Sequence, residues 1–147
     1  MTITVGDVMR KGVDTIDETA SIQETAMKMR DKNVSSLLVV DREGKPTGLV
    51  TERDLVRKVC VNNIRAGEVT NKEIMSFPLI TIDSKSSPSV AADTMLRSNV
   101  RHLIVIDDKS ADVNKPVGMI TPRDFTKYQE YTREEVRSIE KILEYYI

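Results

Sequence analysis

The sequence of 147 residues is poor in the side chains that carry metal, disulfide and stacking chemistry. It has a single cysteine (Cys60), a single histidine (His102) and no tryptophan, and aromatic residues make up 4% of it. One cysteine excludes a disulfide within the chain and is typical of a reducing compartment. One histidine and one cysteine leave too few ligands for a transition-metal site. We therefore expect a cytoplasmic protein without a bound metal.

The sequence also lacks an excess of charge of one sign. Lys and Arg together number 22 and Asp and Glu 23, which gives a formal net charge of -1. A nucleic-acid-binding protein is typically much more basic, so nucleic acid is not an expected partner. No apolar run approaches the ~18–20 residues of a membrane span, and the first residues lack the apolar stretch of a signal peptide. A membrane is not an expected partner either.

The chain repeats itself. Residues 7–41 align with residues 73–107 at a shift of 66 without a gap, and 12 of the 35 positions are identical. Further along, KPTGLVTERDL at 45–55 aligns with KPVGMITPRDF at 115–125 at a shift of 70, with six of 11 positions identical. The second copy thus has four extra residues in the polar segment 108–114, which we expect in a surface turn.

Each copy predicts the same order of elements, β-α-β-β-α. In the first copy Ser21 is a suitable helix N-cap, and Ile22, Ala26 and Met29 are spaced as the apolar face of the helix that follows. Apolar runs bounded by turn signals predict a hairpin in each copy. The predicted elements are extended segments at 13–16 and 79–82, helices at 21–32 and 87–98, strands at 36–40 and 102–106, return strands at 48–51 and 118–121, and second helices from 52 and 122.

We predict an α/β (α+β) fold in which two repeats share one core, because a unit of about 60 residues buries little apolar surface alone. The predicted parts are repeat 1 at 1–61, a linker at 62–71, repeat 2 at 72–131 and a C-terminal amphipathic helix at 132–147. Thr132 and Glu135 form a capping-box pattern at the start of that helix. Its apolar stripe packs on its own domain or a second subunit, or docks a different protein. The stripe consists of Val136, Ile139, Ile142, Leu143 and Tyr146.

The repeat resembles the cystathionine-β-synthase (CBS) domain. The resemblance rests on the aligned residues above, and most of all on T-x-R-D, which ends an aligned hairpin in both copies. It covers about residues 5–130, and two tandem copies look like a Bateman module. The resemblance implies two repeats related by a pseudo-two-fold axis, with clefts between them that often bind adenosine-containing ligands. It also implies regulation of a partner rather than catalysis and, in many members, a homodimer.

The T-x-R-D motifs place Thr51, Arg53 and Asp54, and in the second copy Thr121, Arg123 and Asp124, at a turn from strand to helix. A helix N-terminus favours an anion such as phosphate, and a threonine hydroxyl there can donate to it. The aspartate lies on the same side of the first turn and can accept from both ribose hydroxyls, the role that the resemblance implies. The arginines are candidate phosphate ligands, solvated residues or intersubunit ion-pair partners. Alternatively, the threonines are only N-caps and the aspartates only first-turn acids.

The resemblance implies that the base lies in a slot at the first extended piece of each copy. The matching positions are Val13, Asp14, Thr15 and Ile16 in the first copy and Leu79, Ile80, Thr81 and Ile82 in the second. Asp14 departs from the apolar or small residue expected there. Plain core packing is the alternative role for the apolar members of the set.

The positions just before the second strands differ between the copies: Ser35 and Ser36 in the first, Arg101 and His102 in the second. In some nucleotide-binding relatives a basic pair here reaches the site of the other copy and contacts phosphate. We therefore predict that Arg101 and His102 serve the site at Thr51 and Asp54, which then prefers charged phosphates. The other site, which receives the serines, takes a less charged ligand or stays empty. A structural role for His102 is the alternative.

The sequence thus predicts a regulatory module that binds an adenine nucleotide (AMP, ADP or ATP), forms a homodimer and signals to a separate protein. The alternative is a structural or dimerisation module with degenerate clefts and no nucleotide. An enzyme is not expected, because the sequence has no phosphate-binding loop, serine-hydrolase or zinc-protease motif. No catalytic cofactor is expected either.

Overall fold

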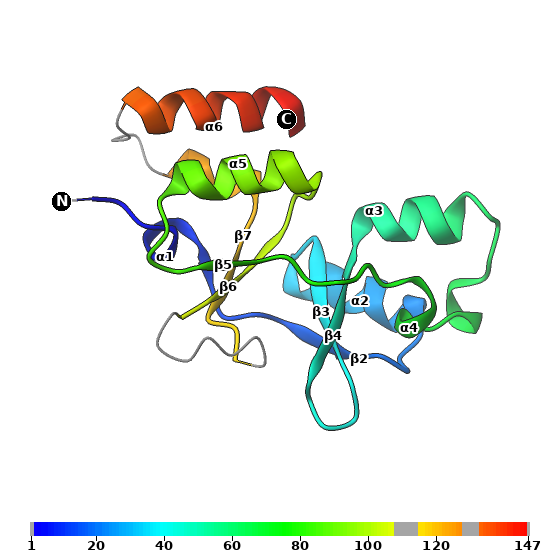
Figure 1. Cartoon of the computed structure of the whole chain (residues 1–147). Coiled ribbons are helices and arrows are strands. Elements are labelled where there is room, and N and C mark those ends of the chain that lie inside the picture. The colour runs from blue at the N-terminus through cyan, green and yellow to red at the C-terminus, as the bar shows by residue number, and fades with distance from the viewer. Residues whose placement is uncertain (1, 108–114, 128–132, 147) are drawn as a thin grey trace. The chain divides into compact units, whose positions relative to one another are not determined.

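The computed structural model describes residues 2–107, 115–127 and 133–146, and most of its helices and strands are labelled in Figure 1. The chain divides into two compact units. Unit 1 combines residues 1–13 with residues 80–147, and unit 2 consists of residues 14–79. Each unit contains one sheet.

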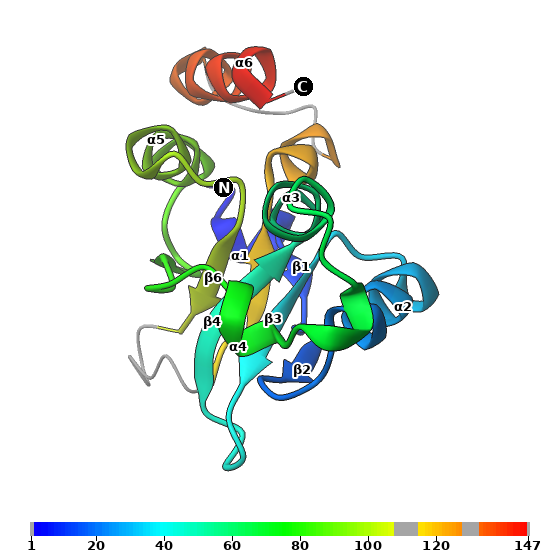
Figure 2. The same cartoon turned by 90° about the vertical axis from the view of Figure 1, so that its right-hand side faces the viewer.

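Unit 2 is built on a three-stranded sheet in the order β2 (Thr15–Asp17), β3 (Ser36–Val40) and β4 (Pro46–Thr51). β2 runs parallel to β3, and β3 runs antiparallel to β4. Figure 2 shows β4 running directly into α3, which places the first T-x-R-D motif at the end of the sheet. The helical segments are α2 (Ile22–Lys32), α3 (Glu52–Asp54), the π-helical η1 (Leu55–Cys60), η2 (Ala66–Glu68) and α4 (Asn71–Ile74).

Unit 1 is built on a four-stranded sheet in the order β1 (Arg10–Lys11), β7 (Gly118–Ile120), β6 (Leu103–Ile106) and β5 (Thr81–Asp83). β5 is parallel to β6, and the other two pairings are antiparallel. Figures 1 and 2 both show α6 lying alongside α5. The helical segments are α1 (Val5–Val8), α5 (Pro88–Ser98), the 3-10 helix η3 (Pro122–Lys127) and α6 (Arg133–Tyr146).

The first residues of each sequence repeat pack on the strands of the other repeat. Arg10 pairs with Met119 of β7, and Ser76 forms a bridge with Leu49 of β4. The two contacts are equivalent, because positions 10 and 76 differ by the shift of 66 and positions 49 and 119 by the shift of 70. The first segment of each sequence repeat therefore belongs to the compact unit that contains the rest of the other repeat. The segment at 62–71 lies in unit 2.

The long helices begin and end where their sequences indicate. The Ser21 hydroxyl accepts from the backbone N–H of Glu24 at 3.1 Å, and the Ser87 hydroxyl caps α5 in the same way. Both helices end at an asparagine in the left-handed conformation, Asn33 with φ 54° and Asn99 with φ 53°. Asparagine tolerates this conformation better than most residues, so the end of each helix is encoded locally.

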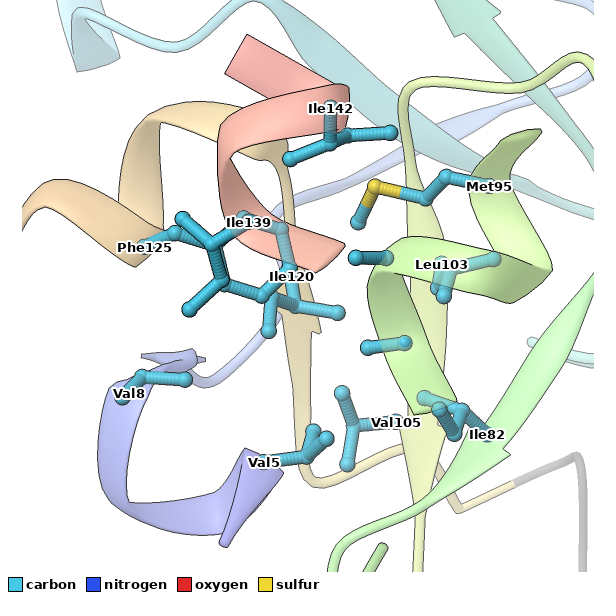
Figure 3. Packing of buried hydrophobic residues seen from close by; sticks show 12 residues of the cluster. Val5, Val8, Ile82, Met95, Leu103, Val105, Ile120, Phe125, Ile139 and Ile142 are labelled. Atoms are coloured by element: carbon cyan, nitrogen blue, oxygen red, sulfur yellow. The ribbon is translucent and has the colours of Figure 1, made fainter. Parts of the chain in front are cut away.

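The core of unit 1 lies between its sheet and helices α1, α5 and α6 (Figure 3). Ile139 and Ile142 of α6 are buried in it, and Leu143 and Tyr146 pack against it. Val136, the first residue of the predicted stripe, is 37% exposed. Most of the apolar stripe of the C-terminal helix thus packs on its own unit, which is one of the partners considered for it. Thr132 and the segment 108–114, for which a surface turn was predicted, lie outside the described residues.

The core of unit 2 shows one departure from the predicted helix face. Ile22 and Met29 are buried, but Ala26 is exposed and Thr25 takes the buried position between them. The Thr25 hydroxyl donates to Asn71 Oδ1 at 2.6 Å, so the polar group is paired inside the core. The mixed α/β fold with two repeats, two sheets and a C-terminal helix is confirmed.

Candidate functional site

Thr51 and Asp54 form a capping box at the start of α3. The backbone N–H and the hydroxyl of Thr51 donate to Asp54 Oδ2 at 3.0 and 3.2 Å, and the Asp54 N–H donates to Thr51 Oγ1 at 3.2 Å. Asp54 is 8% exposed, whereas Arg53 between them is exposed. The N-cap role expected of Thr51 is therefore confirmed, and its ligand role stays a prediction.

The second oxygen of the Asp54 carboxylate is held by residues that the motif does not include. The Ser76 hydroxyl donates to Asp54 Oδ1 at 3.1 Å, and the ammonium of Lys58 lies 3.2 Å from the same atom. Lys58 also donates to the carbonyl of Ile74 at 2.7 Å. The spacing of Asp54 and Lys58, four residues apart on a helix, is a signal that could have indicated this ion pair. Nothing in the sequence indicates Ser76.

Thr121 and Asp124 repeat the arrangement at the end of β7. The backbone N–H and the hydroxyl of Thr121 donate to Asp124 Oδ2 at 2.8 and 3.3 Å. Here the N–H of Asp124 donates to the carbonyl of Thr121 at 3.0 Å. Asp124 is 6% exposed and Arg123 is exposed. Both motifs thus hold a largely buried carboxylate at the junction of strand and helix.

Unit 2 brings most of the first predicted site to one end of its sheet. Thr15 lies opposite Leu38, Ser36 lies opposite Thr51, and the Ser35 carbonyl accepts from the N–H of Glu52. The carbonyl of Asp14 accepts from Leu38 N–H, so this residue enters the sheet through its backbone. Ile16 is part of the core. Val13 belongs to unit 1, and Leu79 is the last residue of unit 2.

Unit 1 brings the second set together in the same way. The carbonyl of Ile80 accepts from Ile104 N–H, Thr81 lies opposite Ile104, and Ile82 is buried in the core. Arg101 and His102 precede β6 in the same unit as the second motif. Their predicted reach to the site at Asp54 stays a prediction.

Arg101 has a partner that the sequence did not indicate. Its Nη2 donates to the carbonyl of Tyr146 at 3.4 Å, and its guanidinium carbon lies 5.4 Å from the centroid of the Tyr146 ring. Tyr146 is the last residue of α6, so a candidate phosphate ligand is in contact with the C-terminal helix.

The described part of the chain also bears on a metal site and on a membrane span. There, no three side chains of the types His, Cys, Asp and Glu gather as metal ligands would. Within the same residues, no helix has both the length and the apolar character needed to cross a membrane.

Comparison with known proteins gives the same family by sequence and by structure. The model of the CBS domain matches the chain twice, at residues 5–60 and 72–131. An uncharacterized protein of Methanopyrus kandleri is 33% identical over 129 residues, which cover 88% of this chain and 64% of that protein. This chain spans less than two thirds of the first curated relatives that it matches, with shares of 64%, 31% and 39%.

Solved structures share the fold. A conserved CBS domain protein of Thermoplasma acidophilum matches with a TM-score of 0.80 at 21% identity, over 98% of this chain and 78% of that one. A CBS domain protein of Pyrobaculum aerophilum, solved in complex with AMP, matches with a TM-score of 0.74 at 23% identity, over 95% and 99% of the two chains. Two matches to the family model, one to each sequence repeat, show that the chain belongs to the CBS domain family as a tandem CBS pair.

Proposed function

We propose that this CBS pair is a regulatory module that binds an adenosine-containing nucleotide (AMP, ADP or ATP) and signals to a separate protein. The observation that carries the proposal is the doubled threonine–aspartate pair, which holds a buried carboxylate beside a helix N-terminus in each unit. Carboxylate oxygens accept from the two hydroxyls of a ribose, and helix N–H groups attract phosphate. The AMP complex of the Pyrobaculum aerophilum relative supports the choice of ligand.

In this proposal Asp54 and Asp124 hold ribose hydroxyls, and Thr51 and Thr121 lie near the phosphates. The segments 13–16 and 79–82 provide the backbone and apolar surface for the base. Arg101 and His102 contact the phosphates of the ligand at Asp54, with Arg53 and Arg123 as further candidate phosphate ligands. The two sites therefore differ in the ligand charge that they prefer.

We further propose that the module is a cytoplasmic homodimer that acts by regulation rather than catalysis. A ligand changes the arrangement of repeats or subunits only to the extent that it binds one arrangement more tightly. The regulated protein reads that difference. A structural module without a nucleotide is the second candidate, and it is favoured by the fact that Asp54 already has Thr51, Lys58 and Ser76 as partners.

The test is a thermal-shift panel of adenosine, AMP, ADP and ATP on the whole chain. A ligand at a hundred times its Kd stabilises the folded state by about 2.7 kcal/mol. Asp54→Ala should abolish the stabilisation by a compound that binds the first site, and Asp124→Ala should spare it. Absence of a shift with every compound would support the structural module instead.

Both variants also remove a helix cap, and Asp7→Ala is the matched control. Asp7 forms the same capping box with Thr4, at 2.8 Å to its backbone N–H and 3.0 Å to its hydroxyl, and belongs to neither predicted site. This variant should lower the melting temperature of the free protein while the ligand-induced shift remains. If the Asp7 variant also lost the ligand-induced shift, the result for Asp54→Ala would be explained by the loss of a helix cap rather than by the loss of a ligand contact.

A further inference from the structure

Four donor groups surround the Asp54 carboxylate. The backbone N–H and hydroxyl of Thr51 contact Oδ2, and the Ser76 hydroxyl and Lys58 ammonium contact Oδ1. An ionised carboxylate offers about four acceptor positions, so these four contacts occupy all of them. A ribose hydroxyl can therefore reach Asp54 only by displacing one of them.

Lys58 is the donor whose charged group can move to a second anion. The Thr51 groups belong to the capping turn, and Ser76 is anchored by backbone hydrogen bonds in both directions with Leu49, at 2.8 and 3.0 Å. The Lys58 side chain is 43% exposed, against 10% for Asp54, and its ammonium also donates to the Ile74 carbonyl at 2.7 Å and to the Ser76 hydroxyl at 3.5 Å. A lysine ammonium is strongly hydrated and rotates on a four-carbon stem, so it can move from one anion to another nearby.

We propose that Lys58 determines the phosphate specificity of the Asp54 site: ribose hydroxyls replace its ammonium at Asp54, and the ammonium then binds the phosphate of the same ligand. This inference rests on the proposed nucleotide function and deepens it. A nucleoside releases Lys58 without giving it a new anion. A nucleotide supplies the anion on the same ribose, so this site discriminates nucleotide from nucleoside.

Unit 1 carries different residues at the positions that match Lys58 and Ser76. The shifts of 70 and 66 place Tyr128 at the position of Lys58, and Arg10 at the position of Ser76. Tyr128 lies outside the described residues, but its side chain is not cationic. The exchange of Lys58 between two anions is therefore proposed for the Asp54 site of unit 2.

The test compares adenosine with AMP by titration calorimetry on the whole chain. All variants are made in parallel in an Asp124→Asn background, so that binding at Asp54 is measured alone. Lys58→Met removes the charge, and Lys58→Gln keeps a donor for the Ile74 carbonyl, so that one variant remains usable if the other fails to fold. Lys72→Met is the matched control, because Lys72 is an exposed lysine of the same unit on α4.

We expect wild-type Lys58 to favour AMP over adenosine, and both Lys58 variants to reduce that preference at least tenfold. Adenosine itself should bind the variants as tightly as before or more tightly, because Asp54 Oδ1 is no longer occupied by an ammonium. An unchanged preference, or an equal loss for both ligands, would overturn the role of Lys58 and leave the nucleotide function intact. Absence of any binding in the parent protein would instead overturn the nucleotide function, and this inference with it.

Discussion

The guanidinium of Arg101 lies over the ring of Tyr146, with 5.4 Å between the guanidinium carbon and the ring centroid. Arg101 precedes β6 and Tyr146 ends α6, so the contact joins the end of the sheet where the motif lies to the C-terminal helix of the same unit. The same arginine is a candidate phosphate ligand. A ligand that draws the Arg101 side chain away would therefore act on the last turn of α6.

The pairing of Arg101 with Tyr146 should be measurable in a double-mutant cycle. A partly exposed cation–π contact is worth about 0.5–1 kcal/mol, and Arg101→Met with Tyr146→Leu should show a coupling energy of that size. The measurement is the free energy of unfolding in denaturant for the four proteins. Tyr145→Leu is the control: the Tyr145 side chain is 65% exposed and its ring lies edge-on to the Tyr146 ring with 4.7 Å between the centroids, so its coupling to Arg101 is indirect and should be smaller. Equal coupling for both tyrosines would contradict the specific contact.

Two glycines that the repeat aligns, Gly48 and Gly118, should differ in their tolerance of alanine. A Cβ on Gly48 would lie 2.6 Å from the sulfur of Met75, part of a side chain that can rotate, whereas a Cβ on Gly118 would lie 2.5 Å from the backbone oxygen of Arg10. Overpacking costs about 1–3 kcal/mol, and we expect Gly48→Ala at the lower end and Gly118→Ala at the upper end. Denaturant unfolding measures both.

Shortening the facing methionine separates the two cases. Met75→Ala should offset part of the cost of Gly48→Ala, because the closest atom is then gone. Met9→Ala should not offset the cost of Gly118→Ala, since the backbone oxygen of Arg10 remains. Gly67→Ala should change the free energy of unfolding little, because a Cβ there meets only the flexible end of Gln23 at 3.2 Å. Similar rescue in both pairs would contradict the difference between them.

The repeat in the sequence predicted the order of elements and the paired motifs, because strands, caps and turns are encoded by neighbouring residues. Ser21, Asn33 and Thr51 all act within their own turn of the chain, and the structure places them as expected. What local patterns could not show is the exchange of the first segments between repeats. Ser76 reaches Asp54 for that reason, across 22 positions of sequence.

Apolar spacing failed where a buried polar pair replaced it. The pattern selected Ala26 for the helix face, but Thr25 is buried because its partner Asn71 lies 46 positions along the chain. Arg101 and Tyr146, which are in contact, are likewise 45 positions apart in the sequence. Such pairs depend on how distant segments pack, and a single sequence gives no sign of them.

Asp17 should make stability depend on acid pH. Its Oδ1 accepts from the hydroxyl and the backbone N–H of Thr19, at 2.6 and 2.7 Å, and these hydrogen bonds hold the pKa of the carboxyl below its ordinary value. The folded state thus favours the ionised form. This contribution is present above the ordinary carboxyl pKa of about 3.9 and is lost as the pH falls through the lower folded value.

The measurement is the melting temperature of the protein and of Asp17→Asn as a function of pH. Above about pH 5 the wild type should be the more stable of the two by a constant amount, and the difference should shrink as the pH falls below about 4. Thr19→Ala removes the donor hydroxyl and should weaken the same pH dependence. A difference that stays constant down to about pH 2 would contradict this account.

The buried pair of Thr25 and Asn71 should be exchangeable for the apolar pair that occupies the same place in the other unit. The shift of 66 aligns Thr25 with Ala91 and Asn71 with Val5, and all four residues are 0% exposed. In unit 2 the Thr25 hydroxyl donates to Asn71 Oδ1, and Asn71 Nδ2 donates to the carbonyl of Asp17 at 2.9 Å. Unit 1 packs aliphatic groups at the aligned positions.

Each single replacement should destabilise the protein, because it breaks the buried hydrogen bond, although in Asn71→Val the Thr25 hydroxyl keeps the Ser21 carbonyl as an acceptor at 3.1 Å. Thr25→Ala deprives the Asn71 amide oxygen of its donor, at a cost of about 1–3 kcal/mol. In the double variant Thr25→Ala with Asn71→Val both groups of the pair are gone, and its loss in free energy of unfolding should be at least about 1 kcal/mol smaller than the sum of the single losses. Strictly additive losses would mean that the hydrogen bond contributes nothing beyond the packing of the two side chains.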